Sequence, residues 1–225
     1  MMQYIIQRVL QTVVVLFFLT LMCFLLVHFI PGDPVLQILG EEATEAEIQK
    51  LRQELGLDKP LLVQYFSWLT DVLRGDLGTS IIYRESVSDL ILHRLPPTLH
   101  IGFTAFVISV LLGVSFGVIA AIRRGSWVDG FISTSANFGM AIPNFWLGIL
   151  GIYFIGLKLG WLPIQGYVSP TEDFWQSTKY ILMPALILGV SSMSILARQT
   201  RSSMLEVIRQ DYIRTARSKG LKRNV

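Results

Sequence analysis

The chain has 225 residues, of which 52% are hydrophobic and only 16% charged, and its formal net charge is +3. The charged fraction lies well below the roughly 25% that is typical of soluble domains. Stretches without any Asp, Glu, Lys or Arg cover residues 9–32, 95–122, 130–157 and 180–197. Because about 20 apolar residues span a bilayer as a helix, these stretches exclude a soluble globular enzyme. They predict an all-α integral membrane protein with four transmembrane helices.

The first apolar stretch predicts a retained span over residues 9–30. It is longer than the 7–15 apolar residues of a signal peptide, and the turn-forming run 31–34 follows it in place of a small-residue cleavage site. The single cysteine, Cys23, lies inside this stretch, so the sequence contains neither a disulfide framework nor a CxxC motif.

The segment 31–98 carries helix signals outside the membrane. Helices are predicted over residues 44–55, 60–73 and 86–95. Thr44 and Glu47 have the spacing of a capping box, Gly56 suits the end of the first helix, and the third is expected to stop before Pro96 because proline cannot continue a helix. The segment either packs on the membrane and on neighbouring spans or forms a docking surface for an extracytoplasmic partner, and the sequence leaves both interpretations open.

The remaining spans are predicted over residues 99–122, 131–157 and 180–197. The second span contains the pair Gly113 and Gly117, whose spacing allows close helix approach. Polar groups inside a membrane usually face a bundle interior or a cavity rather than lipid. The candidate lining of a translocation path is therefore Asn137, Pro143, Asn144 and Ser191, with ordinary helix packing as the alternative for each.

Charge asymmetry predicts the orientation of these spans. If the N-terminus is inside, the inner segments 1–8, 123–130 and 198–225 carry a net charge of +8 and the outer segments −5. Lys and Arg near span ends are retained on the cytoplasmic side, so we expect a cytoplasmic N-terminus. The predicted organisation is an N-terminal region with the first span (1–30), an extracytoplasmic helical segment (31–98), spans two to four (99–197) and a cytoplasmic segment (198–225).

The motifs that are missing from the sequence narrow the function. No predicted span contains Asp, Glu, Lys or Arg, whereas an ion-coupled transporter usually keeps an ionisable group near the midplane. The sequence contains no H-E-x-x-H, no G-x-S-x-G and no P-loop motif. We therefore expect no enzyme, and any uphill transport must draw its energy from a partner.

The last segment predicts an amphipathic helix. Leu205, Ile208, Tyr212 and Ala216 recur at helical spacing, so one face is apolar and the other basic, and Gly220 suits the end of the helix. Such a helix fits a lipid surface, an ordinary basic loop, or a groove on another protein.

A resemblance favours the third interpretation. The run 211–220, DYIRTARSKG, resembles the cytoplasmic coupling motif of ABC-importer permeases, in the form found in the dipeptide, oligopeptide, nickel and glutathione subgroup. The general family pattern is Glu-Ala-Ala, three residues, then Gly; here Arg214, Thr215 and Ala216 take the triplet and Gly220 the glycine. Further pieces agree in order and spacing: Tyr4 with Arg8, and the runs 31–34, 55–60, 75–80, 97–99 and 160–163.

The resemblance implies a type I ABC-importer permease fold. The family pattern has six spans, two of them after the coupling segment, so on this pattern the chain would be a truncated permease. It would form half of a pore in the cell inner membrane for peptides, a nickel chelate or glutathione. The segment that would engage the ATPase comprises Leu205, Ile208, Tyr212, Arg214, Thr215, Ala216 and Gly220.

The resemblance also implies partners. These are ATP-binding subunits, a second permease subunit or homologous pore half, an extracytoplasmic solute-binding protein and the lipid bilayer, with no nucleic acid. ATP and magnesium would lie on the ATP-binding subunits, and this chain would hold no cofactor or metal. The competing interpretations are a non-transporting membrane scaffold or receptor subunit, and an inactive permease fragment.

Overall fold

The computed structural model describes residues 1–29, 32–40, 43–80 and 82–220, without the side chains of Gln37, Arg214, Ala216 and Arg217. Within these ranges the chain is helical and forms no β-strand, apart from a single bridge between Thr79 and Ser86. Contacts divide it into two compact units, Met1–His93 and Arg94–Val225, and each unit is described by itself.

The first unit begins with the first span, α1 (Met2–Phe29). This helix is apolar all round and has no buried residue. A helix that is hydrophobic on every face suits lipid rather than water, so α1 confirms the predicted first span.

Helix α4 (Leu61–Leu73) packs on α1 around the buried side chain of Tyr65. Tyr65 is 1% exposed, and its hydroxyl lies 2.9 Å from the Thr20 Oγ1 atom. Phe17 and Phe24 of α1 meet the Tyr65 ring edge to face. An enclosed tyrosine hydroxyl needs such a hydrogen-bond partner, so this face of α4 packs on a neighbouring span.

A short helix between α1 and α4 was not predicted. It is α2 (Pro34–Leu39), which begins where the Asp33 carboxylate accepts a hydrogen bond from the Val35 N–H group at 2.9 Å. The same carboxylate pairs with Arg52 of α3 (Glu45–Glu54). Asp33 therefore both begins α2 and joins it to α3.

The predicted capping box of α3 is confirmed. The Thr44 hydroxyl donates to the Glu47 carboxylate at 2.7 Å and accepts from the Glu47 N–H group at 3.4 Å. Hydrogen bonds from the Thr44 side chain and backbone lower the pKa of Glu47. At the other end Gly56 has a φ of +66°, and the Leu57 N–H group donates to the Arg52 carbonyl at 2.9 Å, which is the glycine C-terminal motif.

Helix α5 (Val87–Ile122) corrects the predicted stop before Pro96. The helix continues through Pro96 and Pro97 into the second span. These prolines leave the carbonyls of Leu92 and His93 without their helical donors. Both residues are exposed and precede the apolar span, so other donors can reach the freed carbonyls, and the helix is not forced to end.

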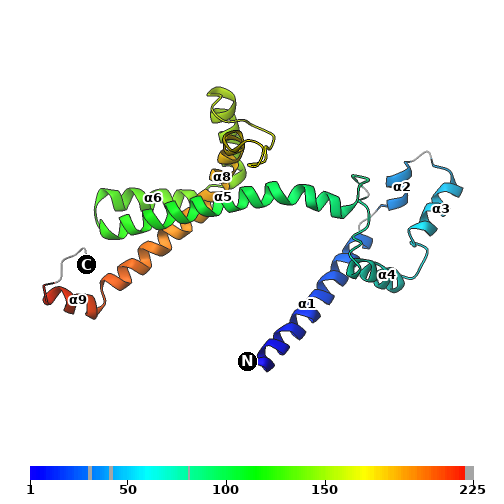
Figure 1. Cartoon of the computed structure of the whole chain (residues 1–225), viewed down its shortest axis with the longest axis horizontal. Coiled ribbons are helices and arrows are strands. Elements are labelled where there is room, and N and C mark those ends of the chain that lie inside the picture. Colours follow the sequence, from blue (N-terminus) through cyan, green and yellow to red (C-terminus); the bar gives the residue numbers. More distant parts are fainter. Residues whose placement is uncertain (30–31, 41–42, 81, 221–225) are drawn as a thin grey trace. The chain divides into compact units, whose positions relative to one another are not determined.

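In the second unit, α5 runs beside α6 (Trp127–Ala141), and α8 (Phe174–Ile208) crosses them (Figure 1). The predicted glycine pair forms the contact between α5 and α8. A Cβ atom added at Gly113 would lie 2.8 Å from the Met193 carbonyl oxygen, and one at Gly117 would lie 2.6 Å from that of Ala197. These distances leave no room for a side chain, so the small residues allow the two backbones to meet.

The predicted third span, 131–157, is not one helix. It consists of α6 and a second helical stretch, α7 (Asn144–Leu150), which continues as the π-helix η1 (Gly151–Lys158), and the two parts are bent by 100°. Pro143 disfavours a helical conformation in the residue before it, and Ile142 is extended with a φ of −81° and a ψ of 125°. The Pro143 carbonyl then accepts from the Trp146 N–H group at 3.0 Å in the new helix.

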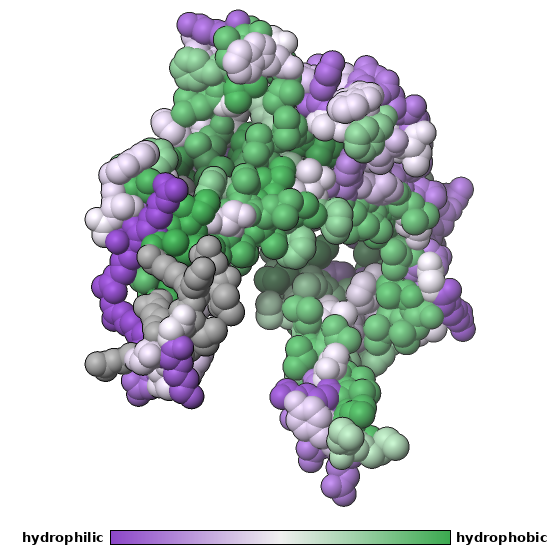
Figure 2. Space-filling view, turned by 60° about the vertical axis from the view of Figure 1, so that its left-hand side comes forward, coloured by the Kyte–Doolittle hydropathy of each residue, from purple (hydrophilic) through white to green (hydrophobic). Residues whose placement is uncertain are grey.

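Helix α8 extends beyond the predicted fourth span, 180–197, at both ends. Asp173 begins it by accepting from the Gln176 N–H group at 2.9 Å. Among the described residues three helices are long and apolar enough to cross a membrane, or four if the bent pair counts as one span. Figure 2 shows apolar side chains over much of the face that it presents, as expected for a surface in contact with lipid or other membrane helices.

Candidate functional site

The predicted coupling segment is two helices rather than one. Helix α8 ends at Ile208, and α9 (Asp211–Ser218) begins after a break at Arg209 and Gln210. The N–H groups of these two residues donate three residues back, at 3.2 Å and 3.0 Å, which tightens and closes the last turn of α8. Asp211 then lies in the first turn of α9, where a negative charge is favourable.

This break corrects the single amphipathic face. Leu205 and Ile208 lie on α8, whereas Tyr212 and Ala216 lie on α9. Tyr212 is 60% exposed, and the Thr215 hydroxyl donates to the Asp211 carbonyl at 2.9 Å. The side chains of Arg214 and Ala216 lie outside the described ones.

The C-terminal end of α9 has the geometry that was expected of a helix end. Gly220 has a φ of +84°, in the region that favours glycine. The helix itself ends two residues earlier, at Ser218.

A hollow of about 520 Å³ lies in the angle between α8 and α9. Its lining consists of Arg201, Ser202, Leu205, Glu206, Arg209, Gln210 and Asp211. Charged and polar groups dominate this lining, so the hollow suits a polar partner rather than an apolar one.

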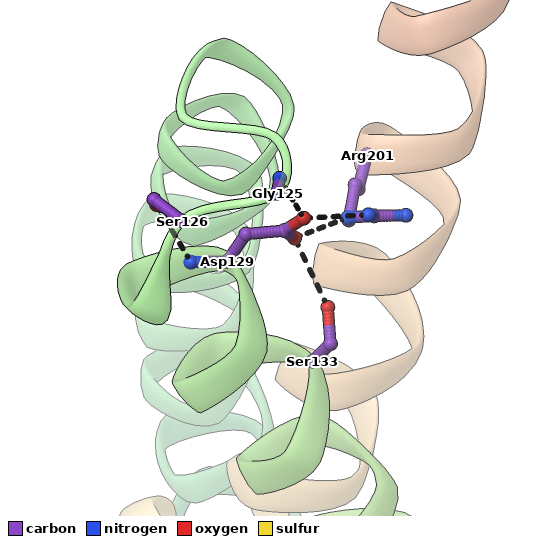
Figure 3. A network of polar contacts seen from close by, with 5 residues as sticks. All are labelled: Gly125, Ser126, Asp129, Ser133 and Arg201. Atoms are coloured by element: carbon purple, nitrogen blue, oxygen red, sulfur yellow. Dashed lines mark hydrogen bonds and ion pairs between the residues drawn. The ribbon is translucent and has the colours of Figure 1, made fainter.

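One partly buried ion pair joins α6 to α8 close to this hollow (Figure 3). The Asp129 carboxylate accepts from the Arg201 Nε atom at 2.6 Å and from its Nη2 atom at 2.8 Å. The Asp129 side chain is 8% exposed and that of Arg201 is 30% exposed. The pairing is therefore bidentate and largely removed from solvent, a geometry that fixes both side chains.

Two further donors complete the Asp129 site. The Gly125 N–H group donates to one carboxylate oxygen at 3.0 Å, and the Ser133 hydroxyl donates to the other at 3.3 Å. Ser126 begins α6 by accepting from the Asp129 N–H group at 3.4 Å. Asp129 thus lies in the first turn of α6, where the partial positive charge of the helix end also favours a carboxylate.

The predicted path residues do not gather in one place. Asn137 is exposed and lines a hollow of about 200 Å³ between α6 and α8, together with Ile132, Ser133, Ala136, Ala197, Arg198 and Arg201. Pro143 and Asn144 lie at the break and are exposed, and Ser191 is half-buried on α8. These three are not part of that lining.

The sequence analysis missed the pair of Asp129 and Arg201. Ser126 and Asp129 have the spacing of a helix start, which could have located the beginning of α6, but the partner lies 72 residues away. Within the described residues, no group of three His, Cys, Asp or Glu side chains could hold a metal ion.

Comparison with known proteins identifies the family. Residues 113–224 match the family described as the inner membrane component of binding-protein-dependent transport systems, and residues 1–102 match the N-terminal family of such membrane components. The chain belongs to this permease family. The permease is therefore a transmembrane subunit of an ABC importer, with the membrane-permease fold that the resemblance implied.

Relatives match nearly all of the permease. A putative peptide transport system permease protein of Brucella abortus (strain 2308) is 41% identical over 217 residues, 96% of this chain and 69% of the relative. A glutathione transport system permease protein of Salmonella typhimurium (strain LT2) is 41% identical over 221 residues, 98% of this chain and 70% of the relative. Membership of the family implies that the permease works with an ATPase and a binding protein.

Proposed function

We propose that the permease forms half of an importer pore for peptides or a related small solute such as glutathione or a nickel chelate. The observation that carries this proposal is the identity of 41% with proteins named peptide and glutathione permeases, over 96% or more of the chain. The other pore half is a second permease subunit. A solute-binding protein delivers the solute from outside the cell.

The proposed orientation has the N-terminus in the cytoplasm. The excess of Lys and Arg in the segments 1–8, 123–130 and 198–225 supports it. With this orientation, α9 and the Asp129–Arg201 pair lie on the cytoplasmic side, α2 and α3 lie on the outer side, and α4 packs on the middle of α1.

The proposed coupling element is α9 together with the end of α8. Helix α9 exposes Tyr212, and the angle that it makes with α8 contains the polar hollow of about 520 Å³. A short helix of this kind fits a groove on the ATP-binding subunit. ATP and magnesium are bound by that subunit, and this chain contributes no catalytic group.

The proposed mechanism is a change between two states. Nucleotide binding brings the ATP-binding subunits together and displaces α9, which favours one arrangement of the pore over the other. The side chains proposed to meet the solute are Asn137 on α6 and Ser191 on α8. At Pro143 and Asn144 the third span bends by 100°.

Two measurements test this function. The tagged permease is purified from its native membranes, and the co-purifying proteins are identified by mass spectrometry. Uptake of radiolabelled trialanine and of radiolabelled glutathione is measured in cells with and without the gene. An ATP-binding subunit in the complex and gene-dependent uptake of either solute would support the proposal. Recovery without an ATP-binding subunit, with unchanged uptake of both solutes, would favour a scaffold or receptor subunit instead.

A further inference from the structure

We propose that Asp129 and Arg201 form a brace that makes α6 and α8 move as one body, so that a displacement of α9 is transmitted to the break at Pro143. This inference rests on the proposed function, because it assigns two positioning residues to the coupling between the ATP-binding subunit and the pore.

Helices α6 and α8 pack along much of α6, and two of their contacts lie near its two ends. Near one end of α6, Gly139 lies against the Ser194 hydroxyl, and a Cβ atom at Gly139 would also lie 3.2 Å from a Val190 methyl group. At the other end lies the ion pair. The contacts are separated by ten residues on α6 and seven on α8, or about 15 Å and about 10 Å at 1.5 Å per residue.

The kind of contact decides how α6 and α8 can move against each other. Apolar packing is non-directional, whereas a bidentate ion pair fixes the orientation of both side chains, so the pair adds a directional contact near the second end of α6. Without the ion pair, uncharged packing such as that around Gly139 would hold α6 to α8. The turn before α6, where Gly125 has a φ of +78°, would then absorb the motion.

The ion pair is suited to this role because it fixes one geometry. The guanidinium donates to the carboxylate through two nitrogen atoms, and Gly125 and Ser133 hold the same carboxylate. Separating a largely buried pair leaves an uncompensated charge and is costly. The contact therefore resists sliding, unlike the apolar packing elsewhere between the two helices.

Arg201 also links the two hollows. It lines the hollow of about 520 Å³ at the angle of α8 and α9, and the hollow of about 200 Å³ that contains Asn137. From Arg201 to Ile208 the helix is uninterrupted, about 10 Å at 1.5 Å per residue. Motion of α9 thus reaches Arg201 through the break at Arg209 and Gln210 and about two turns of continuous helix, and from Arg201 it passes to α6.

The test measures coupling across the membrane. The complete complex is reconstituted in lipid vesicles, and the fold-stimulation of ATP hydrolysis by the purified binding protein is measured per assembled complex. Asp129→Asn and Arg201→Met are each expected to lower this stimulation by about twofold to thirtyfold while the basal hydrolysis rate persists. The double variant is expected to be no worse than either single variant, because the two residues act through one contact.

Two controls separate coupling from stability. Arg124→Met removes an equal charge from an exposed residue in the turn before α6 that lines neither hollow, and should leave the stimulation unchanged. Arg201→Lys keeps the charge but loses the bidentate geometry, so it should lower the stimulation. Because it keeps the charge, this variant tests the brace even if the other variants fail to assemble.

The possible results are distinguishable. Normal stimulation per assembled complex in Asp129→Asn or in Arg201→Lys would overturn the brace, even if less complex assembled. An equal loss in Arg124→Met would overturn it as well, because the loss would then follow from removing any positive charge. No stimulation in the wild-type complex would refute the proposed function, and with it the brace.

Discussion

The contact between α5 and α8 predicts that a single methyl group at Gly117 destabilises the permease. A Cβ atom there would lie 2.6 Å from the Ala197 carbonyl oxygen and 2.6 Å from the Thr200 Cβ atom. Ordinary contacts to a Cβ atom begin near 3.4 Å, so the two helices must separate by about 0.8 Å to admit it. Such overpacking typically costs about 1–3 kcal/mol.

The same helix offers a matched control. Gly102 also lies in α5, and a Cβ atom there has nothing within 4 Å. Replacing glycine by alanine inside a helix gains up to about 1 kcal/mol in conformational entropy in water, so Gly102→Ala is expected to be neutral or slightly stabilising. The two variants differ by no charge and no polar group, so the difference between them measures the helix contact.

The assay is unfolding of the detergent-solubilised permease, followed by loss of helical circular dichroism on titration with a denaturing detergent. Gly117→Ala should unfold at a lower denaturant fraction than the wild type, and Gly113→Ala should do the same because its Cβ atom would lie 2.8 Å from the Met193 carbonyl oxygen. If Gly117→Ala were as stable as Gly102→Ala, the close approach of α5 and α8 would be wrong.

Three further predictions concern other parts of the chain. Gly220→Trp should abolish solute uptake at an unchanged amount of permease in the membrane, because a tryptophan is strained at a φ of +84°. Gly220→Asn should keep more uptake, because asparagine tolerates this conformation. Wild-type uptake in Gly220→Trp would contradict the role of this residue in coupling. Tyr65→Phe should lower the free energy of unfolding by about 0.5–1.5 kcal/mol, because it removes the hydroxyl that meets Thr20 at 2.9 Å; an unchanged value in the same unfolding assay would show that this hydrogen bond contributes nothing. Because Thr44 lowers the pKa of Glu47, this capping box stabilises α3 at a pH above the ordinary pKa of a glutamate and loses its effect as the pH falls through the lowered pKa. Glu47→Gln should remove that part of the pH dependence of the free energy of unfolding. An identical pH profile in the variant and the wild type would refute this prediction.

Local sequence signals predicted the ends of α3 and α4 well. The helices predicted over 44–55 and 60–73 are α3, Glu45–Glu54, and α4, Leu61–Leu73. Their ends are set by hydrogen bonds within one turn, such as those between Thr44 and Glu47. A signal of that kind is complete in the sequence, because every participating atom belongs to neighbouring residues.

Proline shows where such local reasoning fails. Pro96 was predicted to end a helix and does not, whereas Pro143 was placed inside a continuous span and breaks it. Pro184 lies inside α8, which continues through it. Every proline removes the same N–H donor, so the difference depends on what surrounds the freed carbonyls and on whether the next residues can begin a new helix. The proline itself determines neither the surroundings of the carbonyls nor the start of a new helix.

The Asp129–Arg201 pair lay beyond sequence analysis for a related reason. Both residues appeared as ordinary charges at the ends of spans, and the pairing depends on how α6 and α8 are placed in register. That register is set by the small residues, because Gly139 lies against Ser194 of α8 while Gly113 and Gly117 fit against the opposing helix backbone. The glycine pair was recognised as a contact motif, but its partner helix was not.

Helix α8 is consequently the element of the second unit that links α5, α6 and α9. It meets α5 at Gly113 and Gly117, it meets α6 at Gly139 and at the ion pair, and α9 follows its end after a two-residue break. The glycine contacts are close and uncharged, whereas the ion pair is bidentate. A force on α9 therefore reaches α6 through the ion pair at Arg201 and α5 through the contact at Thr200, and α6 passes it on to the break at Pro143.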